Sequence, residues 1–248
     1  MRHQARHPDA VFADPRLAAV YDAFDGERED LNAYLRIADE LGAERVLDVG
    51  SGTGTLAVRL ADTGRTVVGI DPAGASLEIA RSKDPDGRIT WIPGEVADVP
   101  GLGADLAVMT GNVAQVFLTD DEWTRLLQGV HAALRPEGHF VFETRRPGFR
   151  AWEGWASENA PVTVDVPGVG PVEQRLDVTD VSLPLVSFRH TYRFLADDEV
   201  IASDTTLRFR ERDEVEASLA GAGYRILDVR EAPDRPGREM VFIARRAA

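Results

Sequence analysis

An acidic residue followed by three alternating glycines is the pattern in this chain that points most directly to chemistry. Residues 48–54 read Asp-Val-Gly-Ser-Gly-Thr-Gly, which places Asp48 two positions before the first glycine. Backbone N–H groups at such a turn can face a ligand, and glycine lets the ligand approach because it lacks a Cβ atom. A carboxylate beside the turn would repel a pyrophosphate, whereas it would attract an ammonium or sulfonium group. The spacing therefore favours a ligand that carries a positive charge.

The turn is flanked by residues that predict a strand before it and a helix after it. The apolar run 46–49 is typical of a buried parallel strand, and the apolar segment 56–64 is typical of a helix. A second strand, residues 66–70, ends at Asp71, an acid placed to accept hydrogen bonds from a ribose. A dinucleotide fingerprint would require glycine where the chain has Thr55. This spacing weakens the alternative that the protein is a nicotinamide oxidoreductase.

The stretch 46–54 resembles motif I of the class I S-adenosylmethionine-dependent methyltransferases, and every glycine position of that motif matches. S-adenosyl-L-methionine carries an ammonium and a sulfonium group and no phosphate, which suits the acid beside the turn. The resemblance implies that this cofactor binds here and that S-adenosyl-L-homocysteine is the product. We expect no metal, because the acidic pair Asp120 and Asp121 follows the helix cap Thr119 and suits the start of a helix; a metal-dependent methyltransferase is the alternative. The resemblance assigns cofactor binding to Asp48, Gly50, Ser51, Gly52, Gly54, Asp71 and Pro72. The alternative is an ordinary turn between a strand and a helix.

Two later loops complete the cofactor site that the resemblance implies. In this family an acid after the third strand binds the adenine amino group, and the next backbone N–H serves a ring nitrogen; Glu95 and Val96 occupy these positions. The family more often has aspartate where Glu95 stands, and Asp98 is a competing candidate. The loop after the fourth strand should lie beside the methionine part of the cofactor and the acceptor, because carboxyl ends of strands line the ligand crevice. Its candidates are Thr110, Gly111, Asn112 and Gln115, for which a turn or helix-start role is the alternative.

Three side chains are candidates for a part in the transfer step. Tyr21 lies in the sequence Val-Tyr-Asp-Ala-Phe-Asp, which resembles the N-terminal Tyr-Asp segment of many small-molecule methyltransferases, where a tyrosine comes near the reacting methyl group. A core aromatic residue is an equal alternative for Tyr21. A hydroxyl acceptor can require a base, for which His190 is the first candidate and Glu143 the second. For His190, a structural histidine of a sheet is the stronger alternative.

The periodicity of the chain predicts an α/β fold with a Rossmann-like seven-stranded sheet, whose last strand is antiparallel, plus an inserted antiparallel β lid. The pattern has a period of two from about residue 152 to residue 210, as in the run Val186, Phe188, His190, Tyr192 and Phe194. We expect a cofactor-binding core at 15–150 and 211–248, a lid over the crevice at 151–210, and a flexible tail at 1–14. Core strands are expected at 46–49, 66–70, 89–92, 106–110, 139–144, 224–229 and 240–244.

The composition narrows the classes of function. The 248 residues carry a net charge of −14, from 42 acids and 28 bases, with no dense lysine or arginine cluster, which disfavours a nucleic-acid substrate. The absence of cysteine excludes disulfides and thiolate chemistry. No apolar run reaches the roughly 20 residues of a membrane span, and no signal peptide is visible. We expect a cytoplasmic protein with a small-molecule partner and no membrane or nucleic-acid partner; a homodimer is left open.

These expectations combine into one functional hypothesis, which is S-adenosylmethionine-dependent methyl transfer, by direct in-line displacement, to an N or O atom of a small-molecule acceptor (enzyme class EC 2.1.1). A sulfonium methyl is already a good electrophile, so the protein mainly has to align the acceptor and exclude water. The alternatives are a related protein that binds the cofactor without catalysis, and a methyltransferase that acts on protein or RNA. The sequence leaves open the identity of the acceptor, its reacting atom and the need for a base.

Overall fold

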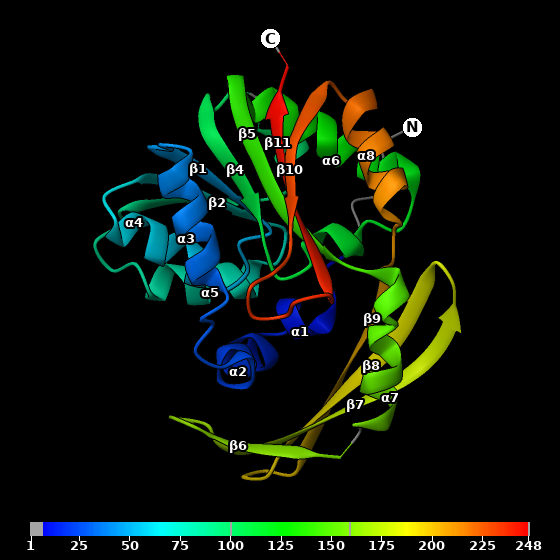
Figure 1. Ribbon diagram of the computed structural model, residues 1–248. Coiled ribbons are helices and arrows are strands. Elements are labelled where there is room, and N and C mark those ends of the chain that lie inside the picture. The colour runs from blue at the N-terminus through cyan, green and yellow to red at the C-terminus, as the bar shows by residue number, and fades with distance from the viewer. Residues whose placement is uncertain (1–6, 100, 159, 248) are drawn as a thin grey trace, which may run out of the picture.

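Two separate sheets organise the chain in the computed structural model, which describes residues 7–99, 101–158 and 160–247 (Figure 1). The larger sheet has seven strands in the order β10-β11-β5-β4-β1-β2-β3, and the smaller has four in the order β6-β7-β8-β9. The predicted fold, a seven-stranded sheet with an inserted antiparallel sheet, is confirmed. The strands of the larger sheet are β1 (Arg45–Val49), β2 (Thr66–Asp71), β3 (Ile89–Pro93), β4 (Ala104–Met109), β5 (Leu134–Arg145), β10 (Tyr224–Arg230) and β11 (Glu239–Arg246).

The strand directions of the larger sheet bring five carboxyl ends to one edge. β1 pairs in parallel with β2 and β4, β2 with β3, and β4 with β5. β11 runs antiparallel to both β5 and β10, as predicted for the last strand. Val46 and Leu47 of β1 have no exposed surface, because β1 is covered on both faces, and this explains its continuous apolar run. The loops that follow β1 to β5 therefore meet at one edge of the sheet.

Helices cover both faces of the larger sheet (Figure 1). On one face α3 (Leu31–Glu40) and α4 (Thr55–Asp62) bury an apolar cluster, and on the other face α6 (Asp120–Ala133) and α8 (Arg212–Gly221) do the same. α5 (Gly74–Ser82) follows β2. A capping box opens α6, because Thr119 and Glu122 each accept a hydrogen bond from the other's backbone N–H. Within the described segments, no helix has the length and apolar character needed to cross a membrane.

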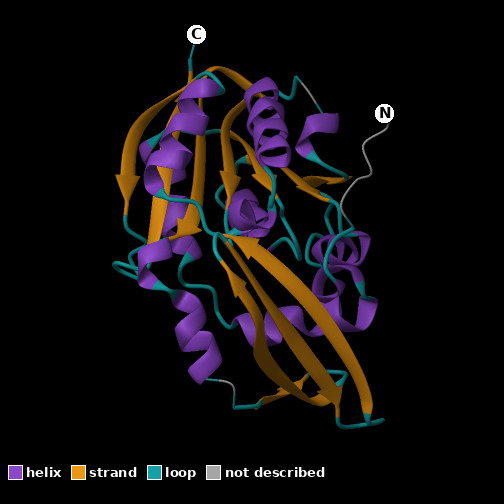
Figure 2. Cartoon of the chain, turned by 90° about the vertical axis from the view of Figure 1, so that its right-hand side faces the viewer, coloured by secondary structure: helices purple, strands orange, loops and turns teal. Residues whose placement is uncertain are grey.

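The smaller sheet is antiparallel throughout and extends away from the larger one (Figure 2). On β8 the predicted alternation is present, since Phe188 and Tyr192 are buried whereas Arg189 and Arg193 are exposed. Its strands are β6 (Val162–Val166), β7 (Gly170–Ser182), β8 (Leu185–Phe194) and β9 (Glu199–Arg208).

A short helix, α7 (Ala151–Ser157), stands where the pattern of period two was expected to begin. The expectation of strand from about residue 152 was therefore wrong at its start. Trp152 and Trp155 are three residues apart and lie on neighbouring positions of this helix. The ring of Trp152 packs 4.9 Å from the ring of Phe209, and the ring of Trp155 packs 5.2 Å from that of Phe188. This aromatic packing explains why the segment is helical.

Two N-terminal helices, α1 (Ala10–Ala13) and α2 (Pro15–Asp25), lie between the larger sheet's helical layer and the smaller sheet (Figure 1). Val11 is buried, and its N–H donates to Ser203 Oγ of β9 at 2.9 Å. The flexible tail expected at residues 1–14 is therefore too long, because residues 10–14 are held by the smaller sheet; residues 1–6 lie outside the described part. Leu17 and Val20 of α2 pack against β8, so α2 joins the two sheets.

Candidate functional site

The glycine turn after β1 combines left-handed backbone with open space on one side. Gly50, Gly52 and Gly54 have φ values of +70°, +52° and +82°, a region that favours glycine. A Cβ at Gly50 would lie 2.8 Å from Val113 Cγ1, and a Cβ at Gly54 would lie 2.6 Å from a ring carbon of Trp91. A Cβ at Gly52 would meet none of the described atoms within 4 Å. Gly50 and Gly54 thus serve close packing, whereas Gly52 borders space that a ligand can fill.

Asp71, the acid at the end of β2, holds the glycine turn in place through a backbone hydrogen bond. Its Oδ2 accepts from the N–H of Gly52, and its Oδ1 accepts from the N–H of Ala73, both at 2.8 Å. Burial raises the pKa of Asp71, and these two backbone hydrogen bonds oppose that rise. The hydroxyl of Ser51 is buried without a hydrogen-bond partner among the described atoms. The turn therefore offers one unused polar group beside the carboxylate that shapes it.

Asp48, the acid before the glycines, is 2% exposed and lies behind the turn. Burial raises the pKa of its carboxyl to about 7, and the charge of Asp71 adds to that rise, whereas Arg28 and a backbone hydrogen bond from Ala57 oppose it. Near neutral pH the group is thus divided between its neutral and ionised forms. A cation bound at the turn would favour the ionised form.

We expect the affinity for S-adenosylhomocysteine, whose amino group is a cation, to rise about tenfold between roughly pH 5.5 and pH 8. The affinity should rise with pH, and not fall, because the pKa of Asp48 is raised to about 7. The carboxyl is mostly neutral below that pH and attracts the ammonium only after it ionises. Calorimetric titration across this pH range measures the effect. Asp48→Asn has nearly the same shape and no charge, so its titrations should be flat with pH. A wild-type affinity that does not change with pH would contradict this account of Asp48.

The helix α2 is tied to the turn through Asp22. Thr53 Oγ1 donates to Asp22 Oδ1 at 2.6 Å, and Lys83 Nζ pairs with Asp22 Oδ2 at 2.5 Å. This anchor fixes α2, whose neighbouring residue Tyr21 lines a hollow beside the loop after β4. The Tyr21 ring packs 5.4 Å from the ring of Phe12, and burial raises the pKa of its phenol well above the usual range. The ring of Tyr21 thus joins an apolar cluster, as the alternative of a core aromatic residue expects, and its side chain also lines this hollow; its place near the reacting methyl group stays a prediction.

The loop after β4 is held by a buried carboxylate. Glu143 Oε1 accepts from the N–H groups of Gly111, at 2.7 Å, and Asn112, at 3.2 Å, and its Oε2 accepts from the hydroxyl of Tyr34. Burial, together with the charge of Glu239, raises the pKa of Glu143. Asn112 has a φ of +60°, and its side chain donates to Glu239 Oε1 at 3.1 Å. One oxygen of Glu143 thus holds the loop beside Thr110, and the other is occupied by Tyr34 of α3.

Two of the predicted site residues differ in exposure, because Gln115 is buried whereas Glu95 is exposed. Gln115 has no exposed surface, and its Oε1 accepts from Arg145 Nη1 at 3.0 Å. The predicted contact between Gln115 and a ligand is therefore not available, and the side chain acts through Arg145. Glu95 is exposed in the loop after β3, and the next residue, Val96, is buried. The N–H of Gly94 donates to the carbonyl of Asp71 at 3.1 Å, which places this loop beside the end of β2.

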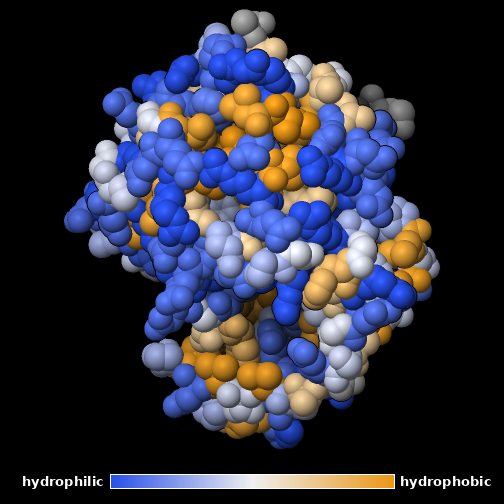
Figure 3. Space-filling view, viewed as in Figure 1, coloured by the Kyte–Doolittle hydropathy of each residue, from blue (hydrophilic) through white to orange (hydrophobic). Residues whose placement is uncertain are grey.

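A hollow of about 410 Å³ opens between α2, the loop after β4, the end of β5 and the segment before β11. The space-filling view shows the surface hollowed between the core and the smaller sheet, with polar and apolar side chains around it (Figure 3). Its lining includes Tyr21 and Asn112, which were predicted from the sequence as site residues. It also includes three arginines that were not predicted: Arg28, Arg145 and Arg235. Arg145 directly ends a core strand, and this position was the signal that could have identified it.

His190 lies on the face of the smaller sheet that is turned toward α2 and α7. Its ring is 5.4 Å from the ring of Phe188 and 6.0 Å from that of Tyr192. Burial lowers the pKa of His190 to about 4, so the imidazole is neutral at pH 7. Within the described residues, His190 is not among those that line the large hollow. The structure thus brings Tyr21 and the loop after β4 together at the large hollow. His190 lies outside that lining, on the smaller sheet.

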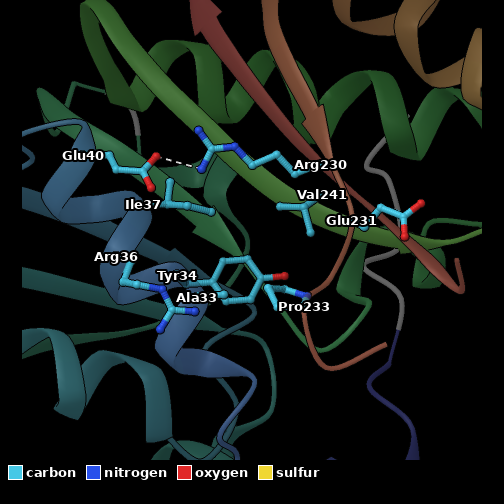
Figure 4. A pocket seen from close by; sticks show the side chains of 9 residues that line it. All are labelled: Ala33, Tyr34, Arg36, Ile37, Glu40, Arg230, Glu231, Pro233 and Val241. Atoms are coloured by element: carbon cyan, nitrogen blue, oxygen red, sulfur yellow. Dashed lines mark hydrogen bonds and ion pairs between the residues drawn. The ribbon is translucent and has the colours of Figure 1, made fainter. Parts of the chain in front are cut away.

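A second hollow, of about 80 Å³, lies between α3 and the strands β10 and β11 (Figure 4). Arg230 and Glu40 pair across one end of it at 2.7 Å. The ring of Tyr34 lines this hollow, while its hydroxyl donates to Glu143. Tyr34 therefore links the small hollow to the carboxylate that holds the loop after β4, and the described lining of neither hollow includes a residue of the glycine turn.

Comparison with known proteins identifies the class of the core domain. Residues 46–138 match a family model described as "Methyltransferase domain". An uncharacterized methyltransferase from Oceanobacillus iheyensis is 37% identical over 103 residues, which are 42% of this chain and 47% of that protein. A ubiquinone biosynthesis O-methyltransferase from Vibrio parahaemolyticus is 29% identical over 124 residues, which are 49% of this chain and 52% of that protein. The chain thus spans about half the length of these curated relatives.

Solved structures share the fold over nearly the whole chain. A sugar N-methyltransferase from a Streptoalloteichus species has a TM-score of 0.80 at 17% identity and covers 100% of this chain and 98% of its own. An amino pentose methyltransferase from Micromonospora echinaspora, solved with bound S-adenosylmethionine, has a TM-score of 0.72 at 21% identity and covers 99% and 100%. These likenesses show the fold. Residues 46–138 thus match a methyltransferase domain, and the whole chain has the fold of these methyltransferases, as the resemblance of the glycine turn predicted.

Proposed function

We propose that the chain is an active enzyme that transfers a methyl group from S-adenosylmethionine to an N or O atom of a small-molecule acceptor. The observation that carries this proposal is the turn at Gly52, which borders open space and is flanked by the acids Asp48 and Asp71. When bound, the cofactor supplies a methyl group that its sulfonium makes electrophilic. The chain then has to bind both partners, align the acceptor and keep water out.

The residues that would hold the cofactor come from the loops after four neighbouring strands. In this proposal the turn after β1 and the loop after β4 hold the methionine part, the end of β2 holds the ribose, and the loop after β3 holds the adenine. The unused hydroxyl of Ser51 and the unused carbonyl oxygen of Asn112 support it, because a buried polar atom without a partner is a candidate for a ligand contact. The residues assigned to the cofactor are Asp48, Gly50, Ser51, Gly52, Gly54, Asp71, Pro72, Glu95, Val96, Thr110, Gly111 and Asn112.

Tyr21 and Glu143 are assigned different parts. Tyr21 lines the hollow and keeps its proton because burial raises its pKa, so it can donate a hydrogen bond to a bound molecule. Glu143 has both oxygens occupied by Gly111, Asn112 and Tyr34, and we therefore assign it to positioning the loop rather than to accepting a proton. His190 remains the candidate base.

We propose a small molecule as the acceptor, and an amino sugar is the first class to test. Two structures with the same fold act on sugars, a sugar N-methyltransferase and an amino pentose methyltransferase. The hollow of about 410 Å³ has the size of a small-molecule site. A net charge of −14 also makes a nucleic-acid acceptor unfavourable.

For a hydroxyl acceptor, replacement of His190 by glutamine should lower kcat by about 10²- to 10⁴-fold, because a positioned base contributes about that much. The pKa near 4 predicts that the wild-type rate shows no histidine titration between pH 6 and pH 8. The matched control is His139→Gln, which removes a histidine from β5 that lies outside the site. If His190→Gln turns over a hydroxyl acceptor at the wild-type rate, His190 is only a residue of the sheet.

The experiment that tests the proposed function is a screen of amino sugars, amines and phenols with methyl-labelled S-adenosylmethionine. Mass spectrometry should detect one acceptor class that gains a labelled methyl group, together with S-adenosylhomocysteine. A protein that binds S-adenosylhomocysteine and yet methylates no acceptor in such a screen would favour the alternative of a cofactor-binding protein without catalysis. Labelling of added protein or RNA in preference to small molecules would overturn the assignment of the acceptor.

A further inference from the structure

Arg145 is a cation in the large hollow that lacks a close carboxylate partner. It ends β5, and its Nη1 donates to Gln115 Oε1, an uncharged oxygen, at 3.0 Å. Across the described residues its one ion pair is to Glu239, whose Oε1 lies 3.9 Å from Arg145 Nε. That oxygen already accepts from Arg235 at 2.9 Å and from Asn112 at 3.1 Å. The charge of Arg145 is therefore only weakly compensated by the protein itself.

The other two arginines of the hollow differ from Arg145 in this respect. Arg28 pairs with Asp25 at 2.6 Å and with Asp30 at 3.0 Å. Arg235 pairs with Asp234 at 2.7 Å and with Glu239 at 2.9 Å. Burial is also the largest influence on the pKa of Arg145 and lowers it, in keeping with a charge that lacks a full partner. A partly buried cation of this kind is stabilised when a ligand brings an anion to it.

The guanidinium of Arg145 is held in place by an aromatic ring. It lies 5.2 Å from the centre of the Trp155 ring, at the start of the lid, and its Nη1 also donates to Gln115. The cation–π contact and one hydrogen bond restrain the guanidinium, which leaves its remaining N–H groups to bind a planar anion. A carboxylate matches that geometry because it can accept two parallel hydrogen bonds.

We propose that Arg145 forms a carboxylate-binding subsite for the acceptor, so that the small molecule methylated by this enzyme carries a carboxylate. This inference rests on the proposed function and adds the chemical class of the substrate. The cofactor also carries a carboxylate. We assign the subsite to the acceptor because Arg145 contacts Trp155 of the lid and lies on β5, whereas the glycine turn follows β1, two strands away in the sheet order.

The test uses two pairs of probes that differ only in charge, glucuronate with glucuronamide and benzoate with benzamide. Each probe is titrated calorimetrically into the full chain in the presence of saturating S-adenosylhomocysteine. We expect at least one acid to bind about tenfold or more tightly than its amide, and Arg145→Gln to abolish that preference. Gln115→Glu should also weaken the preference, because it places a carboxylate of the protein on the same guanidinium. Arg230→Gln, at the small hollow, is the matched control and should keep the wild-type preference.

Each outcome bears on one part of the inference. If no acid binds better than its amide, or if the preference survives in Arg145→Gln, there is no carboxylate subsite at Arg145. If Arg145→Gln weakens S-adenosylhomocysteine itself by tenfold or more while the protein melts normally, the subsite belongs to the cofactor, and the assignment to the acceptor is overturned. If wild-type protein does not bind S-adenosylhomocysteine, the proposed function fails first, and the two failures are thereby distinguished.

Discussion

Replacement of Gly52 by alanine should weaken the binding of S-adenosylhomocysteine by about tenfold to hundredfold while the protein stays folded, since forcing a methyl group into a filled space costs about 1–3 kcal/mol. A Cβ at this position meets no described atom within 4 Å, so the protein itself has room for it. The same space is where the proposed ligand would approach the backbone. Calorimetric titration gives the affinity, and thermal unfolding shows whether the fold survives.

The matched control for this change is Gly42→Ala. Gly42 follows α3 with a φ of +59°, close to the +52° of Gly52, and a Cβ there also meets nothing within 4 Å. Both variants therefore carry a similar cost for alanine in left-handed backbone, about 1 kcal/mol or somewhat more. Gly42 precedes β1, whereas Gly52 follows it, so only Gly52 lies at the ligand edge. Equal affinities for S-adenosylhomocysteine in the two variants would show that no ligand approaches Gly52.

Replacement of Asp71 by alanine should lower the affinity for S-adenosylhomocysteine by about a hundredfold or more. The carboxylate has two tasks in this account, because it accepts from the N–H of Gly52 at 2.8 Å and would also accept from the ribose hydroxyls. Hydrogen bonds to a charged group contribute about 1.5–3 kcal/mol each. The loss of both tasks should therefore lower the affinity by at least about two powers of ten, and by several powers of ten at most.

A double-mutant cycle separates the two tasks of Asp71. Wild-type protein and Asp71→Ala are each titrated with S-adenosylhomocysteine and with its 2′-deoxy analogue. If the carboxylate binds the ribose, removal of the hydroxyl should cost less in the variant, with a coupling of about 1.5–3 kcal/mol. If the two changes are additive within about 0.5 kcal/mol, Asp71 only shapes the turn, and the ribose assignment is lost.

The core sheet and its ligand edge could be predicted because local signals there agree with the final fold. The buried run 46–49, the glycines of the turn and the strand ending at Asp71 each have one physically favoured structure. The alternation on β8 likewise predicted which side chains face inward. In these segments, tertiary packing and local preference require the same backbone.

The rest of the site depends on contacts between distant segments that carry no local pattern. Glu239 of β11 receives a hydrogen bond from Asn112, and Glu143 holds the loop at Gly111; nothing in the residues nearby predicts these pairs. The helix at Trp152 is stabilised by Phe209, which follows β9, more than fifty residues later in the chain. Glu143 was predicted as a base because it ends a strand at the ligand edge, yet its two oxygens are occupied by the loop and by Tyr34.

Whether the chain binds S-adenosylmethionine rather than a dinucleotide is tested most directly by calorimetric titration. The wild-type chain is titrated with S-adenosylhomocysteine and, separately, with NAD. We expect binding of one S-adenosylhomocysteine per chain in roughly the micromolar range and no binding of NAD. Asp48 beside the turn and Thr55 in place of a third fingerprint glycine are the reasons for that preference. A well-folded sample that does not bind S-adenosylhomocysteine, or that prefers NAD, would contradict this expectation.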